Sequence, residues 1–217
     1  DGKPDLIVSS GNSGIFSVFQ NTTSSAGNIS FAAKKDYSLL SHPDNITTAD
    51  LDNDGKPDLI TSNFSGNSIS IFRNTSTGGV LSLGPEIDYA VGSNPDYVSA
   101  GDLDGDGKLD LAVGNYSSNS ISFFKNNSGT GFIDMGGRQD SALAATTISF
   151  ADINGDGKID LCTGIGLSGN ISVFENNYSG SGAFSFARKV DFTTGNYDTY
   201  ASVGDLNGDG KPELVAV

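Results

Sequence analysis

Short apolar runs recur along the whole chain and predict β-strands. The runs hold four to six residues, partly alternate with polar positions, and are bounded by Gly, Asn and Ser. Runs of this length favour strands, because an amphipathic helix needs a longer stretch with a period near 3.6 residues. Each stretch of about 50 residues contains four predicted strands, which in one stretch are a more irregular one at 81–89 and three short ones at 97–101, 109–114 and 121–124.

An acidic segment recurs with the same period as these strands. Its four full copies occupy residues 50–58, 102–110, 152–160 and 205–213, and a fifth copy, residues 1–5, matches only the second half of the segment. The full copies begin 52, 50 and 53 residues apart. Four short antiparallel strands per repeat are typical of one blade of a β-propeller. We therefore expect an all-β fold in which residues 1–217 form one β-propeller fragment of about four blades, with repeat junctions near the acidic segments.

The strand count predicts an open arc and not a closed ring. The strand that leaves the acidic segment occurs five times, first at 5–9 and last at 213–217, whereas every other strand type occurs four times. In a closed four-bladed ring the first and last copies would compete for one place. We expect the chain to be part of a larger ring of roughly six to eight blades. The alternative is association between chains through open blade edges, since unpaired edges invite pairing.

The acidic segment has the oxygen pattern of a cation-binding loop. Side-chain oxygens occur at positions 1, 3 and 5, Gly occurs at position 6, and an acid occurs at position 9. The glycine permits a sharp turn that brings the backbone carbonyl of position 7 inward, as in the first half of an EF-hand calcium loop. Position 12 holds Thr61, Val113, Thr163 or Ala216 instead of the bidentate Glu of an EF-hand. We therefore expect the acid at position 9 to close the coordination shell.

These positions predict about four structural Ca²⁺ sites. An oxygen-only donor set favours Ca²⁺, because Mg²⁺ resists dehydration and transition metals prefer His or Cys. One such loop could be a turn and nothing more, but four copies with the same oxygens favour metal binding. Binding by Asp1 and Asp5 of the partial copy stays open. The expected ligands are Asp50, Asp52, Asp54, Lys56, Asp58, Asp102, Asp104, Asp106, Lys108, Asp110, Asp152, Asn154, Asp156, Lys158, Asp160, Asp205, Asn207, Asp209, Lys211 and Glu213, with the lysines contributing their backbone carbonyls.

The segment Gly-Asp-Leu-Asp-Gly-Asp-Gly-Lys-Leu-Asp-Leu-Ala-Val-Gly at 101–114 and its three sister segments resemble a known repeat family. They are similar to the calcium-binding repeats of the FG-GAP and VCBS type, found in integrin α-subunit propellers, microbial surface proteins and some propeller lectins. The match is weaker at the Phe-Gly and Gly-Ala-Pro signatures, because Ala49, Ala100, Phe150 and Val203 lead into the loops. The chain thus resembles the microbial branch more than an integrin. The resemblance implies a calcium-binding propeller with the same loop residues as ligands.

The net charge of −14 arises mainly in the acidic segments. The chain has 26 Asp and Glu against 12 Lys and Arg, and the five segments hold 16 of these acids and 5 of these bases. An acidic surface repels phosphate backbones and anionic lipids, so we expect no nucleic-acid partner and no membrane insertion. No apolar run approaches the roughly 18 residues of a membrane span, which predicts a soluble protein, here an excised piece of a longer one.

Few residues are suited to catalysis. His42 stands beside Pro43 in a polar turn and is expected to be solvated, and Cys162 is expected to be buried in a strand. Asp36, Asp88 and Asp191 occupy one equivalent position in three repeats. Such repetition indicates a structural role, because an active site is needed only once. We expect no enzyme activity, although a pair of carboxylates acting on glycosides stays open.

Polar segments between the strands are candidate ligand contacts. They are residues 22–27, 76–79, 93–97, 128–131 and 193–200, of which the last contains Tyr197 and Tyr200. These rings could stack on a sugar or anchor a protein, although packing between blades is the favoured interpretation for Tyr200. Weak oxygen-only calcium sites are filled where calcium is millimolar, which predicts a secreted or cell-surface location. We predict a calcium-stabilised, non-catalytic adhesion module that binds a protein or glycan on a propeller rim. The alternative is a propeller domain of, or accessory to, a secreted polysaccharide-active enzyme.

Overall fold

The computed structural model describes residues 2–10, 13–25, 27–39, 42–165, 169–195 and 200–216, and this part of the chain is all-β. Seventeen strands and no helix occur in it. Accordingly, the described residues include no helix long and apolar enough to cross a membrane. The predicted all-β class is confirmed.

The strands form five antiparallel sheets, and strands that follow one another in sequence are hydrogen-bonded neighbours within each sheet. In the described residues, the first sheet holds three strands, the second to fourth hold four each, and the fifth holds two. The first sheet contains β1 (Leu6–Ser10), β2 (Ile15–Phe19) and β3 (Lys35–Ser38); the second contains β4 (Pro43–Ala49), β5 (Asp58–Asn63), β6 (Ser68–Asn74) and β7 (Leu83–Ala90); the third contains β8 (Pro95–Gly101), β9 (Asp110–Asn115), β10 (Ser120–Phe124) and β11 (Gln139–Ser141); the fourth contains β12 (Thr147–Ala151), β13 (Asp160–Ile165), β14 (Asn170–Asn176) and β15 (Phe186–Thr193); the fifth contains β16 (Ala201–Gly204) and β17 (Glu213–Ala216).

Each four-stranded sheet repeats the same order of strand types. The first strand enters the acidic segment, the second leaves it, the third carries the Ile-Ser-x-Phe pattern, and the fourth forms the outer edge. Among the described strands, the type that leaves the acidic segment occurs five times, as β1, β5, β9, β13 and β17, and each other type occurs four times. This agrees with the strand count expected from the sequence.

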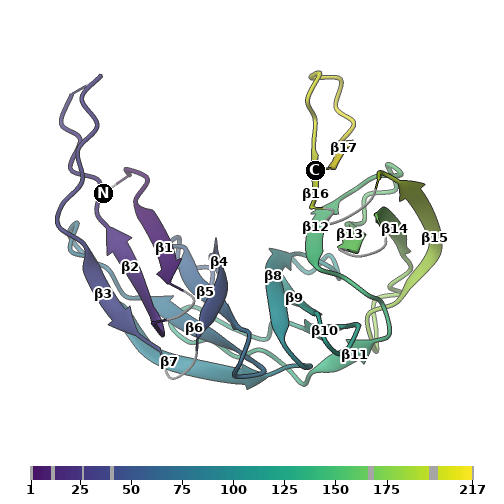
Figure 1. The fold of residues 1–217 in the computed structure, drawn as a ribbon, viewed down its shortest axis with the longest axis horizontal. Coiled ribbons are helices and arrows are strands. Elements are labelled where there is room, and N and C mark those ends of the chain that lie inside the picture. Colours follow the sequence, from purple (N-terminus) through teal and green to yellow (C-terminus); the bar gives the residue numbers. More distant parts are fainter. Residues whose placement is uncertain are drawn as a thin grey trace.

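The five sheets follow one another along an open arc (Figure 1). The first strands of successive sheets contact each other on the inner side of the arc, β4 with β8, β8 with β12, and β12 with β16. The two chain ends lie on either side of the opening (Figure 1). Successive acidic segments are also neighbours, because residues of 2–5 and 55–57 line one groove and residues of 102–105 and 157–159 line another.

Apolar side chains fill the layers between successive sheets. Side chains alternate along a strand, so Leu111 and Ala112 of β9 enter different layers. A sheet with neighbours on both sides is therefore buried on both faces, and every residue of β5 and β9 is buried. The layers contain Phe16, Val18, Leu59 and Phe72 between the first and second sheets, Ile69, Ile71, Val98, Leu111 and Phe124 between the second and third, and Leu103, Ile121, Phe123, Ile148, Leu161 and Phe174 between the third and fourth.

Cys162 and His42 lie where the sequence predicts them. Cys162 is fully buried in β13, opposite Ser149 and Val173 on the two neighbouring strands. Burial raises the pKa of its thiol to about 12. His42 is exposed directly before β4. The buried Cys162 thiol therefore lacks the electropositive, partly exposed surroundings of a reactive cysteine.

Two expectations about the polar segments are wrong. The segment 93–97 is not a free loop, because Pro95, Asp96 and Tyr97 begin β8. Tyr200 does not pack between sheets, because its side chain is 62% exposed. It precedes β16, and the fifth sheet offers only β16 and β17 beside it in the described residues. Tyr197 of the same segment lies outside the described residues.

Candidate metal centres

Each acidic segment forms the loop of a tight hairpin between the first two strands of a sheet. We name them loop 1 (50–58), loop 2 (102–110), loop 3 (152–160) and loop 4 (205–213). In each hairpin the last residue of the incoming strand is opposite position 9, which starts the outgoing strand as the sequence predicts. The closing pairs are Ala49 with Asp58, Gly101 with Asp110, Ala151 with Asp160, and Gly204 with Glu213.

The loop backbone is left-handed at positions 4 and 6. The glycines at position 6, Gly55, Gly107, Gly157 and Gly210, have φ angles from 85° to 87°. Residues with a Cβ rarely adopt such angles, which is why the turn requires Gly here. Position 4 has φ of 54° at Asn53 and of 76° to 81° at Gly105, Gly155 and Gly208. The sequence analysis missed position 4, although Asn and Gly are the residues that tolerate this conformation.

The carboxylate at position 1 holds the turn together by accepting N–H groups of its own loop. The oxygens of Asp102 accept from the backbone of Gly105 at 2.8 Å, Asp106 at 3.1 Å and Gly107 at 3.0 Å. Asp50, Asp152 and Asp205 accept corresponding bonds. At positions 3 and 5, Oδ1 accepts the N–H two residues further on in all four loops. The loop conformation is therefore encoded locally.

In loops 1 to 3 the acid at position 9 binds the backbone of loop position 2 and the recurrent Asn at the end of the third strand. Oδ2 of Asp110 accepts from Leu103 N at 3.0 Å, and Oδ1 accepts from Asn126 N at 2.8 Å. Asp58 and Asp160 accept the same two types of bond. Burial raises the pKa of Asp110 to about 6 despite these N–H donors, with a smaller contribution from nearby loop carboxylates. Burial also raises the pKa of Asp58.

The partial first copy keeps the position 9 contact. Asp5 accepts a hydrogen bond from Asn21 N at 2.8 Å, which is the bond that Asn126 makes to Asp110. Asp1 lies outside the described residues. The recurrent acid therefore has the same structural contact even where only half of the loop is present.

Three carboxylates approach one another in each of loops 1 and 2. Oxygens of Asp50, Asp52 and Asp58 lie within 4.8 Å of one another, and so do oxygens of Asp102, Asp104 and Asp106. In loops 3 and 4, Asn154 and Asn207 replace the acid at position 3. The donors are all oxygens, and like charges this close repel one another unless a cation neutralises them. The predicted side-chain donors thus fit an oxygen-preferring cation, which would supply that neutralisation.

The lysines at position 7 use their side chains elsewhere. Nζ of Lys108 donates to Ser128 O at 2.8 Å, and Nζ of Lys158 donates to Tyr178 O at 3.1 Å. Nζ of Lys56 instead lies 3.4 Å from Asp54 Oδ2. The proposed use of the backbone carbonyls of these residues and of Lys211 as ligands stays a prediction.

A recurrent asparagine joins the loops of neighbouring sheets, and the sequence analysis gave it no role. Nδ2 of Asn126 donates to Leu109 O in its own sheet and to Leu51 O in the preceding sheet, each at 2.9 Å. Its Oδ1 accepts from Ser128 N at 2.8 Å. Asn176 makes the equivalent bond to Leu103 O in the preceding sheet at 2.8 Å. The available signal was the recurrence of Asn at 21, 74, 126 and 176.

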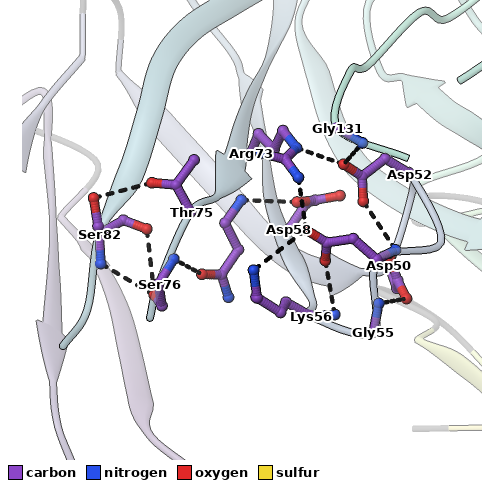
Figure 2. A network of polar contacts seen from close by, with 12 residues as sticks. Asp50, Asp52, Gly55, Lys56, Asp58, Arg73, Thr75, Ser76, Ser82 and Gly131 are labelled. Carbon is purple, nitrogen blue, oxygen red and sulfur yellow. Dashed lines mark hydrogen bonds and ion pairs between the residues drawn. The ribbon is translucent and has the colours of Figure 1, made fainter. Parts of the chain in front are cut away.

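Loop 1 also contains an ion pair with Arg73, at the end of β6. Nη2 of Arg73 lies 2.6 Å from Asp54 Oδ2. Nε of Arg73 donates to Asp52 Oδ2, as Figure 2 shows. Gly131, in the third sheet's β10–β11 connection, donates its N–H to Asp52 Oδ2 at 3.0 Å (Figure 2). Burial acts to raise the pKa of Asp52, but the bonds from Arg73 and Gly131 outweigh it and lower that pKa.

Loop 2 contains the corresponding pair with Lys125. Its Nζ contacts Asp104 Oδ2 and lies 3.5 Å from Asp106 Oδ2. The bond to Asp104 raises the pKa of Lys125, although burial opposes this. The sequence analysis missed both basic residues, because they are about 20 residues away from the carboxylates that they contact.

The repeated acids of the outer strands make one common contact. Asp36, Asp88 and Asp191 each accept a hydrogen bond at 2.6 Å from the Ser of the adjacent third strand, namely Ser17, Ser70 and Ser172. Asp140 accepts the same bond from Ser122 at 2.7 Å. Asp140 was missed although it lies 18 residues after Ser122, the same separation as between Ser70 and Asp88; Ser141 follows it, whereas an aromatic residue follows each of the other three acids. A contact that recurs in four sheets favours the structural role expected for these acids.

The fold and its loops define a class of all-β repeat proteins in which each repeat carries an acidic hairpin loop. Residues 1–61, 50–113, 102–163 and 152–216 each match the model of one family, described as FG-GAP-like repeat. The chain belongs to this FG-GAP-like repeat family.

Two further comparisons concern whole chains. No curated protein matches the sequence. Among solved structures, the chain is similar to a Bacteroides fragilis protein with the provisional name 6-phosphogluconolactonase, at 19% sequence identity and a TM-score of 0.62. The likeness covers 97% of this chain and 54% of that one. At this identity the likeness concerns the fold alone, and the present chain spans about half of its structural neighbour.

Proposed function

We propose that this chain is an arc of a calcium-stabilised β-propeller that serves outside the cell as a non-catalytic binding module for protein or carbohydrate. Each four-stranded antiparallel sheet would be one blade, and the inner strands would face the propeller axis. The open arc and its fit to about half of a longer chain support membership of a larger ring. Open edges that pair with a second chain are the other way to complete the arc.

The observation that carries the calcium sites is the recurrence of the same oxygen-bearing hairpin in four successive sheets. The ligands of each site come from one loop, which suits a structural ion better than a catalytic one. The loops also lie where successive sheets meet, as shown by the bonds from Asn126 to Leu51 and from Asn176 to Leu103. A cation that binds only the folded loop would therefore stabilise the contacts between sheets by mass action.

The donor chemistry supports the proposed extracellular location. An oxygen-only site with several carboxylates binds Ca²⁺, and a weak site of this kind stays filled where calcium is millimolar. In the cytosol, where calcium is scarce, such loops would keep their crowded carboxylates unneutralised. The proposed module therefore works as a secreted or cell-surface protein.

Grooves along the loop edge support a binding role. One groove of about 640 Å³ lies between residues 2–5 and 55–57 and includes the predicted contact segment 76–79. A second groove of about 620 Å³ lies between loops 2 and 3 and includes Tyr178. Both have volumes typical of small-ligand sites. We propose that a glycan or a protein loop is bound along this edge.

Removal of calcium tests the structural part of this function. The melting temperature of the calcium-loaded protein should exceed that in excess EGTA by at least about 5 °C, because binding to the folded state alone stabilises it. Circular dichroism measures both melts, and excess Mg²⁺ serves as the control cation. Identical melts with calcium and with EGTA would exclude structural calcium.

The alternative is a propeller domain of, or accessory to, a secreted polysaccharide-active enzyme. A carboxyl pair does exist, since Asp44 of β4 is hydrogen-bonded to Asp96 of β8. Direct contact is closer than the roughly 5 to 9.5 Å that separates the carboxyl groups of glycosidases. A glycan and protein array probed in calcium, with a hydrolysis assay on any glycan that binds, separates the two functions.

A further inference from the structure

The residue directly before the recurrent Asn differs among the repeats in step with loop position 3. It is Arg73 beside loop 1 and Lys125 beside loop 2, where position 3 is an acid. It is Glu175 beside loop 3, where position 3 is Asn154. The three residues occupy one structural position, because each follows a Phe at the end of the third strand, and Phe72, Phe124 and Phe174 pair with a Leu next to loop position 9.

In loops 1 and 2 the basic residue supplies a positive charge to the acids at positions 3 and 5. Arg73 is bound to Asp52 and Asp54, whose side chains are 0% and 8% exposed. Lys125 is bound to Asp104 and lies beside Asp106. In both loops the contact is made to Oδ2, while Oδ1 accepts an N–H of the loop. A tethered cation thus partly neutralises the carboxylates that a metal ion would otherwise neutralise.

Loop 3 has the opposite arrangement. Its acids Asp152, Asp156 and Asp160 take part in none of the ion pairs found in the described residues. Glu175 places a fourth negative charge at the position that is basic in the other two sheets. The loop acids together with this neighbour carry a formal charge of −3 at loops 1 and 2 and of −4 at loop 3.

We infer that Arg73 and Lys125 are tethered counter-cations that hold loops 1 and 2 in shape without metal and weaken calcium binding there, whereas loop 3 binds calcium more tightly than loops 1 and 2. This role rests on the calcium sites of the proposed function. A positive charge next to a Ca²⁺ site repels the ion, and a negative charge attracts it. Loops 1 to 3 therefore differ in calcium affinity, with two sites partly neutralised by a basic side chain and one strongly metal-dependent site.

Calcium titration of the metal-free protein tests this grading. Arg73→Gln and Lys125→Gln should each tighten one site about tenfold, and Glu175→Gln should weaken one site about tenfold. Arg138→Gln is the matched control, because it removes one positive charge from an ion pair with Asp140 on the outer edge. Its calcium affinities should stay within about twofold of those of the wild type. Arg73→Lys keeps the charge and should also keep the wild-type affinity.

Transfer of the loop 2 residues to loop 3 provides an independent test. The double variant Asn154→Asp, Glu175→Lys gives loop 3 the acid and the lysine found at loop 2, and its affinity should fall to that of loop 2. Unchanged affinities in the single and double variants of a protein that does bind calcium would overturn the grading alone. A wild-type protein that binds no calcium would overturn the proposed function instead.

Thermal melts in EGTA complete the test without any bound metal. Arg73→Gln and Lys125→Gln should lower the metal-free melting temperature more than Arg138→Gln does, because they leave poorly exposed carboxylates unpaired. The difference between melts with calcium and with EGTA should widen in the same two variants. Equal metal-free melts for all three variants would contradict a holding role for Arg73 and Lys125.

Discussion

At the scale of single residues, two buried polar groups show how the repeats diverge. In β5, Thr61 donates to Asn63 Oδ1 at 3.1 Å. The equivalent pair in β9 is Val113 and Asn115, and in β13 it is Thr163 and Ile165. Among the described residues, Asn115 Oδ1 and Thr163 Oγ1 are buried atoms without a hydrogen-bond partner. β9 therefore contains the acceptor of this pair without the donor, and β13 contains the donor without the acceptor, whereas β5 contains both.

Restoring or breaking this pair should change stability in opposite directions. Val113→Thr supplies a donor to Asn115 Oδ1 and should raise the free energy of unfolding by up to about 1 kcal/mol. Thr61→Val leaves Asn63 Oδ1 without that donor and should lower it by about 1 to 2 kcal/mol. Urea unfolding at fixed calcium measures both.

Val98→Thr is the matched control for this pair of variants. Val98 is opposite Val113 in the sheet and is 1% exposed, so the new hydroxyl is equally buried. It should lower the free energy of unfolding by about 1 to 3 kcal/mol. If Val113→Thr lowered the free energy of unfolding as much as Val98→Thr, the new hydroxyl would not be stabilising Asn115 Oδ1, and the prediction would be wrong.

At the scale of elements, the recurrent Asn after the third strand determines how one hairpin loop meets the next. Asn126 is 1% exposed and bonds to the carbonyls of Leu51 and Leu109 and to the N–H of Ser128. Among the described residues, the side chain of Asn74 bonds within its own sheet alone, to Pro57 O at 2.9 Å and from Ser76 N at 3.0 Å. The same residue type therefore holds one loop at Asn74 and two loops at Asn126.

Alanine substitutions should distinguish the contact within one sheet, made by Asn74, from the contact between two sheets, made by Asn126. Asn126→Ala leaves two carbonyls and an N–H without partners and should lower the free energy of unfolding by about 2 to 4 kcal/mol. Asn74→Ala should cost about 1 to 2 kcal/mol, because no bond between sheets is lost. The costs should persist in EGTA, as measured by urea unfolding. Equal costs for the two variants would show that the bond to Leu51 contributes nothing.

At the scale of the whole molecule, inner strands of neighbouring sheets bring acids together across the arc. Asp96 of β8 is half-buried and hydrogen-bonded to Asp44 of β4. Burial raises the pKa of Asp96 to about 6, and Asp44 adds to the rise. The folded state therefore holds this proton more tightly than the unfolded state, where a typical Asp has a pKa near 3.9.

This pair makes the contact between the second and third sheets pH-dependent. Between pH 4 and 6 the contribution of Asp96 to stability falls as pH rises, and the penalty is complete above about pH 6. Asp96→Asn should be more stable than the wild type at pH 7, and this advantage should disappear near pH 4. Urea unfolding at both pH values in saturating calcium measures it. An advantage that is the same at both pH values would contradict a charge-based cause.

Much of the fold could be predicted because its signals are local. The four loops place their predicted side-chain donors within nine consecutive residues, and Gly at position 6 marks the turn. Strand types were found from their recurrence, so β1 and β17 appeared as extra copies of one type. Asp140 keeps the regular spacing but was missed because Ser141 follows it, where an aromatic residue follows the other three acids. Tyr200 was misplaced because burial depends on which strands lie beside it.

The sequence by itself determined the all-β class, the repeat, the loop side chains expected to bind metal and the structural use of the recurrent acids, because each follows from a short period or from neighbouring residues. Only the tertiary structure decided what surrounds each loop. Arg73 lies about 20 residues from its carboxylates, and Gly131 lies 79 residues from Asp52. Such contacts form when successive sheets pack, and no local pattern of residues encodes that packing. Charge composition gave the number of acids, but the packing of the sheets determined which acids a basic side chain already neutralises.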